Sequence, residues 1–154
     1  MTPQKYGFII EDKITEFLKN TRHHIYTEKE IRQNYSYITA IDQMIILDDV
    51  CICFQDKWVS RPISNSMFGH FTKSCEYIKN SLNRPVIGIY LSNQPFSKEA
   101  ANMLLLENNN NNNIIYYCLY DIQLNTLLNK LHNILHDNNI YIYDDDNEIV
   151  MATL

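Results

Sequence analysis

Two uninterrupted apolar runs constrain the fold of this chain more than any other feature. They cover residues 85–91, PVIGIYL, and residues 114–120, IIYYCLY. Strands that are apolar on both faces are typical of parallel sheets covered by helices on each side. Between the two runs, Ser97 is suited to N-cap a helix through Glu107. The pattern predicts a strand–helix–strand unit in a covered sheet.

The first third of the chain predicts helices followed by a β-hairpin. Residues 7–20 carry apolar side chains at helical spacing, and Thr27 and Glu30 have the form of a capping box for a short helix. Residues 37–47 and 50–58 are β-like runs, and the acidic pair between them suits a tight turn. In the second run, Gln55 and Lys57 share a face with two cysteines.

The remaining segments complete an α/β fold class. Residues 68–82 and 124–135 have helical apolar stripes, and residues 140–151 are expected to form a terminal hairpin. The predicted order is α-β-β-α-β-α-β-α, with a mixed sheet flanked by helices. The length of 154 residues fits one domain over 1–154. The six asparagines at 108–113 are expected to be an exposed loop without regular structure.

Composition excludes several classes of function. The chain has only three glycines, so the glycine-rich phosphate loops and the nucleophile elbow of serine hydrolases are missing. A formal net charge of −5 argues against a protein that coats nucleic acid through overall charge. No apolar run reaches the length of a membrane span, so we expect no membrane partner and an intracellular location. The four cysteines are expected to be reduced, with Cys51 and Cys53 facing inward.

One constellation of polar residues on the predicted hairpin suits phosphodiester hydrolysis. That reaction needs hard oxygen ligands for a metal ion and a cation where negative charge develops. Asp42 lies on the first strand, while Gln55 and Lys57 lie two apart at the end of the second. Adjacent strands are about 5 Å apart, so one hairpin can bring all three around one metal ion.

These residues and their neighbours resemble the Mrr-like branch of the PD-(D/E)xK nucleases. That branch typically places I-D at the first core strand, as in Ile41-Asp42, and Q-x-K in the second, as in Gln55-Asp56-Lys57. A G-x-x-x-E pattern in the first helix is also typical and matches Gly7 to Glu11, while residues 95–100, PFSKEA, resemble a later motif. The resemblance extends from residue 7 to about residue 131 and implies a restriction-endonuclease-like core.

The resemblance implies a role for each residue. Asp42 and Gln55 would bind Mg²⁺ or Mn²⁺, Glu11 would contact the metal or hold Lys57, and Lys57 would act on the water and the developing charge. DNA is the implied partner, and a homodimer is compatible with the family. Phosphate contacts are expected from three residues downstream of the hairpin, namely Arg61, His70 and Lys73.

Other interpretations of these residues are compatible with the sequence. The same fold without catalysis, binding nucleic acid or protein, is one; an α/β interaction domain unrelated to nucleic acid is another. Cys51 and Cys53 with the pair His23-His24 offer a zinc site at unfamiliar spacing. His132 and His136 have the i, i+4 spacing of a zinc helix, although a structural position at the edge of a leucine stripe is favoured.

Overall fold

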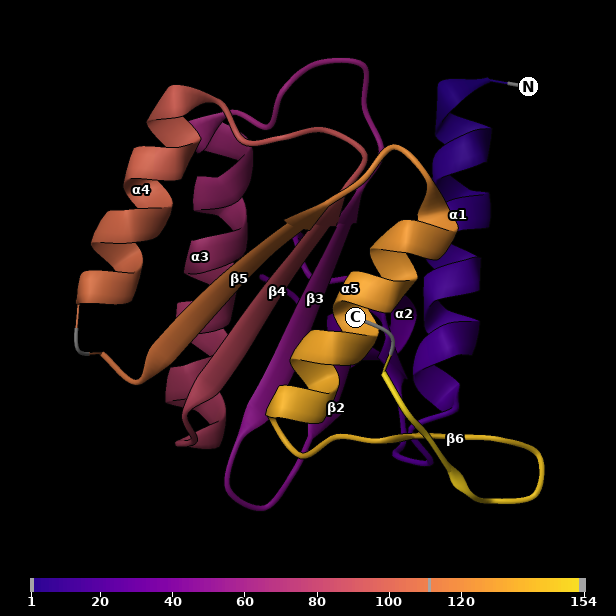
Figure 1. Cartoon of the computed structure of the whole chain (residues 1–154). Helices are drawn as coiled ribbons and strands as arrows, with labels where there is room; N and C mark the ends of the chain where they lie inside the picture. The colour runs from indigo at the N-terminus through magenta and orange to yellow at the C-terminus, as the bar shows by residue number, and fades with distance from the viewer. Residues whose placement is uncertain (1, 111, 153–154) are drawn as a thin grey trace.

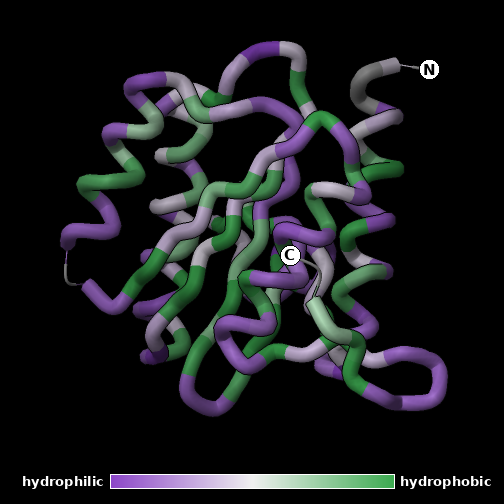
Figure 2. Tube along the Cα trace, in the orientation of Figure 1, coloured by the Kyte–Doolittle hydropathy of each residue, from purple (hydrophilic) through white to green (hydrophobic). Residues whose placement is uncertain are grey.

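A mixed five-stranded sheet forms the centre of the structure, and helices cover both of its faces (Figure 1). This computed structural model describes residues 2–110 and 112–152 of the chain. The tube coloured by hydropathy shows apolar residues gathered along the central strands (Figure 2). The predicted α/β class and the mixed sheet flanked by helices are therefore confirmed.

The sheet combines an antiparallel half with a parallel half. Its strands lie in chain order, β1 to β5. Pairing is antiparallel from β1 to β3 and parallel from β3 to β5. The strands are β1 (Tyr26–Thr27), β2 (Gln43–Ile46), β3 (Cys51–Lys57), β4 (Val86–Ser92) and β5 (Ile114–Tyr120). The carboxyl ends of β3, β4 and β5 consequently meet at one end of the sheet, at the top in Figure 1.

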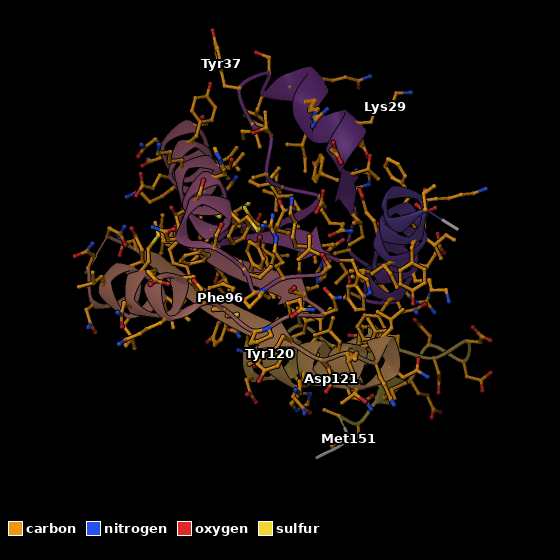
Figure 3. The ribbon with its side chains drawn as sticks, turned by 90° about the horizontal axis from the view of Figure 1, so that it is seen from above. Lys29, Tyr37, Phe96, Tyr120, Asp121 and Met151 are labelled. Atoms are coloured by element: carbon orange, nitrogen blue, oxygen red, sulfur yellow. The ribbon has the colours of Figure 1, made fainter. Side chains whose placement is uncertain are left out.

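Each face of the sheet has its own apolar core. On one side α1 (Pro3–Lys19) and α5 (Leu124–Asp137) pack against residues such as Ile52 and Phe54. On the other side α3 (Asn65–Leu82) and α4 (Lys98–Asn109) cover a core that contains Cys51 and Cys53. The view from above shows the sheet between these two pairs of helices (Figure 3). The predicted alternation along β3 is thus confirmed, and both cysteines are buried as free thiols.

Helix starts follow the capping chemistry of the sequence. Thr2 caps α1 and Pro3 occupies its first turn, so the helix begins four residues earlier than Gly7, where periodicity placed it. Short α2 (Glu28–Asn34) has the predicted capping box between Thr27 and Glu30. Ser64 and Ser97 cap α3 and α4 through their side-chain oxygens.

Two predicted segments differ from the structure. Within 37–47, only residues 43–46 form a strand; before it, Ile38, Ala40 and Ile41 are buried without strand pairing, so burial alone produced the β-like pattern. Helix α4 continues through Asn109, so the first two asparagines of 108–113 are helical and not part of a loop. Asn111 lies outside the described residues.

The chain after α5 folds back as the expected hairpin. It consists of β6 (Ile142–Tyr143) and β7 (Ile149–Val150), joined by the acidic turn. Asp144 accepts the backbone N–H of Glu148 within that turn.

Within the described ranges, every helix is too short or too polar to cross a lipid bilayer.

Candidate functional site

The β2–β3 hairpin holds Asp42 in a fixed position just before β2. The Asp42 N–H donates to the Phe54 carbonyl at 2.8 Å, which continues the strand pairing by one bond. The Asp42 Oδ2 accepts the backbone N–H of Asp56 at 2.7 Å. Both bonds use the backbone of β3, so the carboxylate is oriented by the strand that also carries Gln55 and Lys57.

All four residues predicted for catalysis line one cavity at the end of β3. This strand-end cavity has a volume of about 310 Å³. Glu11 comes from α1, Asp42 precedes β2, and Gln55 and Lys57 come from β3. The complete lining is Gly7, Phe8, Glu11, Asp42, Gln55, Asp56, Lys57, Trp58 and Val59. Residues up to 46 positions apart in sequence therefore line one cavity.

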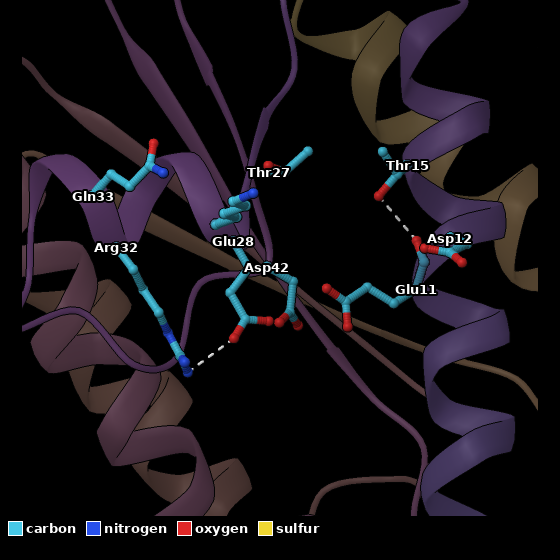
Figure 4. A pocket seen from close by; sticks show the side chains of 9 residues that line it. Glu11, Asp12, Thr15, Thr27, Glu28, Arg32, Gln33 and Asp42 are labelled. Atoms are coloured by element: carbon cyan, nitrogen blue, oxygen red, sulfur yellow. Dashed lines mark hydrogen bonds and ion pairs between the residues drawn. The ribbon is translucent and has the colours of Figure 1, made fainter.

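A third carboxylate, which the sequence did not reveal, joins Glu11 and Asp42. Glu28 lies in the first turn of α2, and one carboxylate oxygen from each of these three residues lies within 4.8 Å of the others (Figure 4). Glu28 also forms an ion pair with Arg32 at 2.8 Å. The capping box predicted the helix that carries Glu28, but only the packing of α2 against β1 and β2 brings its side chain to Asp42.

Burial, reinforced by neighbouring carboxyls, raises the pKa values of Glu11 and Asp42. Burial raises the pKa of Glu11 to about 7, and the neighbouring carboxyls of Glu28 and Asp12 add to the shift. Burial also raises the pKa of Asp42 to about 8, opposed by the hydrogen bond from Asp56 and reinforced by Glu11 and Glu28. A bound cation would reverse this balance, because it favours the charged carboxylates.

A buried polar network under the cavity connects α1 to the hairpin. The Gln43 side chain is fully buried, and its Nε2 donates to Thr15 Oγ1 at 3.0 Å and to Asp56 Oδ2. The same nitrogen lies 3.4 Å from the Glu11 carbonyl. Burial raises the pKa of Asp56 well above its usual range, with the Asp42 charge adding to the effect. This network sets the distance between Glu11 on α1 and Asp42 on the hairpin.

Two residues that line the strand-end cavity, Gln55 and Asp56, each have a buried side-chain oxygen (Oε1 and Oδ1) with no hydrogen-bond partner among the described residues. The Gln55 Nε2 makes only a long contact of 3.4 Å to the Asp56 carbonyl. An unpartnered buried carbonyl oxygen is costly unless something else coordinates it. Gln55 lines this cavity with Glu11 and Asp42, and all three side chains offer oxygen atoms, the ligands that Mg²⁺ and Mn²⁺ prefer. The residues present therefore fit the expected cation.

Lys57 lies between the strand-end cavity and a neighbouring one. This α3-side cavity, of about 220 Å³, is lined by Thr39, Ala40, Gln55, Lys57, Met67, His70 and Tyr90. In the described part of the chain, Lys57 makes no ion pair or side-chain hydrogen bond. Its ammonium group is therefore available to an anionic ligand in either cavity.

The three predicted phosphate contacts are only partly brought together. His70 lines the α3-side cavity, and Arg61 lines a further cavity that adjoins the strand-end cavity. Lys73 is exposed on α3 and lines none of the cavities described here. It follows His70 by three residues, nearly one turn, and that turn carries it away from the carboxyl end of β3.

The alternative zinc sites are not formed. Cys51 and Cys53 are buried in the α3 and α4 core, whereas His24 is exposed and pairs with Glu30 at 3.1 Å. His132 is bonded through Nε2 to the Val150 carbonyl, so it has the structural role that the leucine stripe indicated. Within residues 2–110 and 112–152, the carboxylate trio is the one group that could hold a metal ion.

Comparison with family models, with curated proteins and with solved structures gives no match for this chain. The function of this chain is therefore inferred from the chemistry of its own site residues.

Proposed function

We propose that this chain is a divalent-metal-dependent nuclease domain with a restriction-endonuclease-like core that hydrolyses phosphodiester bonds in DNA. One observation carries the proposal: Glu11, Asp42, Gln55 and Lys57 line a single cavity at the end of β3. Three of them offer oxygen ligands and one offers a cation, which is the combination that the reaction requires.

The metal-binding residues in this proposal are Asp42 and Glu11, with Gln55 offering its free Oε1. Glu28 adds a third carboxylate and compensates for the neutral side chain at position 55. The bound cation would supply charge neutralisation at the phosphate and a water of lowered pKa.

The chain's own residues have separate tasks. Asp56 orients the Asp42 carboxylate through its backbone N–H, and Gln43 fixes α1 through Thr15. Lys57 places an ammonium group beside the phosphate, where it stabilises the negative charge that develops as the bond breaks. His70, at the mouth of the α3-side cavity, contacts the neighbouring phosphate.

The test is nicking of supercoiled plasmid with Mg²⁺ or Mn²⁺. Lys57→Ala is expected to cut cleavage by about 100-fold or more, the scale for loss of one preorganised donor. Asp42→Asn should have a similar effect through loss of the cation. Gln55→Glu should retain or raise activity, because it restores a carboxylate ligand. Lys98→Ala, at an exposed position at the start of α4, is the matched control and should cleave as wild type.

Two results would contradict this proposal. Equal cleavage by wild type, Lys57→Ala and Asp42→Asn would mean that the activity comes from another site or from a contaminant. No cleavage by wild type on any DNA, with DNA binding intact, would favour a non-catalytic role for the same fold.

A further inference from the structure

A larger cavity opens directly beside the strand-end cavity. This aromatic cavity has a volume of about 580 Å³, within the usual range of small-molecule pockets. It shares Trp58 and Val59 with the strand-end cavity. Its lining consists of Tyr6, Trp58, Val59, Ser60, Arg61, Met67, Asn93 and Gln94. A ligand that occupies one cavity therefore adjoins the other.

Large aromatic rings surround both openings. Tyr6, in the aromatic cavity, is 46% exposed, and Phe8, in the strand-end cavity, is 58% exposed. Both are on α1, whose N-terminal part lies at the same end of the sheet as the loop after β3 (Figure 1). Trp58 is half-buried and packs against the α1 and α5 core. Exposed aromatic rings gathered at a cavity indicate a ligand with a flat apolar face.

The loop that carries the cavity wall is held in place before any ligand arrives. Asn93, after β4, accepts the Val59 N–H at 2.9 Å and donates to the Val59 carbonyl at 2.8 Å. This pair fixes the loop after β3 to the loop after β4. The cavity is preformed to that extent, so less ordering is needed when a ligand binds.

The polar groups of the cavity suit a nucleotide. Arg61 is exposed and makes no ion pair in the described part of the chain, and the Gln94 side-chain amide makes no hydrogen bond there. A guanidinium group binds phosphate, an amide reads the edge of a base, and aromatic rings stack on its face. With a net charge of −5, this chain has little long-range attraction for duplex DNA, so local stacking has to contribute much of the affinity.

We infer that the aromatic cavity binds an unpaired nucleobase next to the phosphate in the strand-end cavity, so that single-stranded DNA is the preferred ligand. The inference rests on the proposed function for the neighbouring phosphate. A base inside a duplex is stacked on both sides and cannot fill this cavity without leaving the helix.

The chain has one tryptophan, so the fluorescence of Trp58 reports on this cavity directly. The full chain is titrated in EDTA, without cleavage, with a thymidine oligonucleotide of about 12 nucleotides. An abasic strand with the same number of phosphates and a duplex of the same length are titrated in parallel. The thymidine strand should quench Trp58 and bind about 5- to 100-fold more tightly than the abasic strand, the range for stacking on one aromatic side chain.

Variants of Tyr6 separate stacking from charge. Tyr6→Ala is expected to weaken binding of the thymidine strand about 5- to 100-fold, whereas Tyr6→Phe keeps the ring and should bind as wild type. The control is Tyr37→Ala, because Tyr37 is 81% exposed and lines none of these cavities (Figure 3).

Equal affinity for the thymidine and abasic strands, or for strand and duplex, would overturn the inference. So would full binding by Tyr6→Ala. Because binding is measured without metal, the two proposals fail separately. If DNA quenches Trp58 in a Tyr6-dependent way but the protein never cleaves DNA, the nuclease proposal is refuted and the nucleobase-binding inference stands. If the protein cleaves DNA with metal and Tyr6→Ala changes nothing, the nucleobase-binding inference is refuted and the nuclease proposal stands.

Discussion

Replacing Asp42 by asparagine should stabilise the metal-free chain while destroying its metal site. Burial raises the pKa of Asp42 to about 8, and the neighbouring carboxyls of Glu11 and Glu28 reinforce the shift; among the described residues Asp42 forms no ion pair. Asparagine has nearly the same shape and retains an oxygen that can accept the Asp56 N–H. The substitution therefore removes the cost of the charge and keeps the hydrogen bond.

The sign of the pH dependence follows from the raised pKa values. Glu11 and Asp42 rise from 4.5 and 3.8 in the unfolded chain to about 7 and about 8 in the fold. Between about pH 4 and pH 8 the folded chain thus holds protons that the unfolded chain has released, so stability falls as pH rises through this window. The stability that comes from holding these two protons is fully present at about pH 4 and is lost by about pH 8.

The size of the expected stabilisation follows from the same pKa values. Raising the pKa of a carboxyl from 4.5 to about 7 corresponds to about 3 kcal/mol, at about 1.4 kcal/mol for each pKa unit. Because Asp42 and Glu11 share one environment, a proton held on one relieves part of the cost on the other. We therefore expect Asp42→Asn to raise the free energy of unfolding by about 1 to 3 kcal/mol at pH 8 and by little at pH 5. For a chain of this length, that corresponds to a rise in Tm of about 3 to 10 °C.

The assay is urea and thermal unfolding of wild type and Asp42→Asn at both pH values, with EDTA and with Mn²⁺. At pH 8 a saturating cation should stabilise wild type by about 3 kcal/mol at a hundred times its Kd, and should leave Asp42→Asn unchanged. Asp145→Asn, at an exposed turn, is the control for the loss of one negative charge. If Asp42→Asn destabilises the chain equally at pH 5 and pH 8, the carboxylate is a structural acceptor and the reasoning fails.

Three further substitutions test the packing around the site. Gly7→Ala should stabilise the chain by about 0.5 to 1 kcal/mol in urea unfolding, because a Cβ at this helical position meets nothing within 4 Å; a loss of stability would show that the backbone there needs glycine. Gly88→Ala should cost about 1 to 3 kcal/mol, since its Cβ would lie 2.7 Å from the Tyr116 ring, and an unchanged Tm would mean that the ring can move. Asn108→Ala should cost about 1 to 2 kcal/mol and speed amide exchange at Tyr116, whose N–H and carbonyl it bonds at 2.8 and 2.9 Å. Asn109→Ala, at an exposed neighbouring position, is its control, and equal effects of the two would refute the role of Asn108.

The main helices and strands, and the face of β3 that carries Gln55 and Lys57, could be read from local patterns along the chain. The long apolar runs became β4 and β5: β4 is buried on both faces and has no polar side, whereas β5 is the edge strand and leaves Ile115 and Tyr120 exposed. Alternation along β3 fixed which residues share a face, and hairpin geometry placed Asp42 beside Gln55 and Lys57. These are local rules of period and spacing, so they can be read from a single chain.

Features that depend on how separate helices and strands pack could not be read from those local patterns. Glu28 lies near Asp42 because α2 packs against β1 and β2, and the Asn108 side chain bonds the backbone of the edge strand β5. Lys73 has the charge for a phosphate contact but lies a turn too far along α3. Charge, capping and composition are properties of the chain, whereas the distance between two side chains on different elements follows from packing, which no local pattern records.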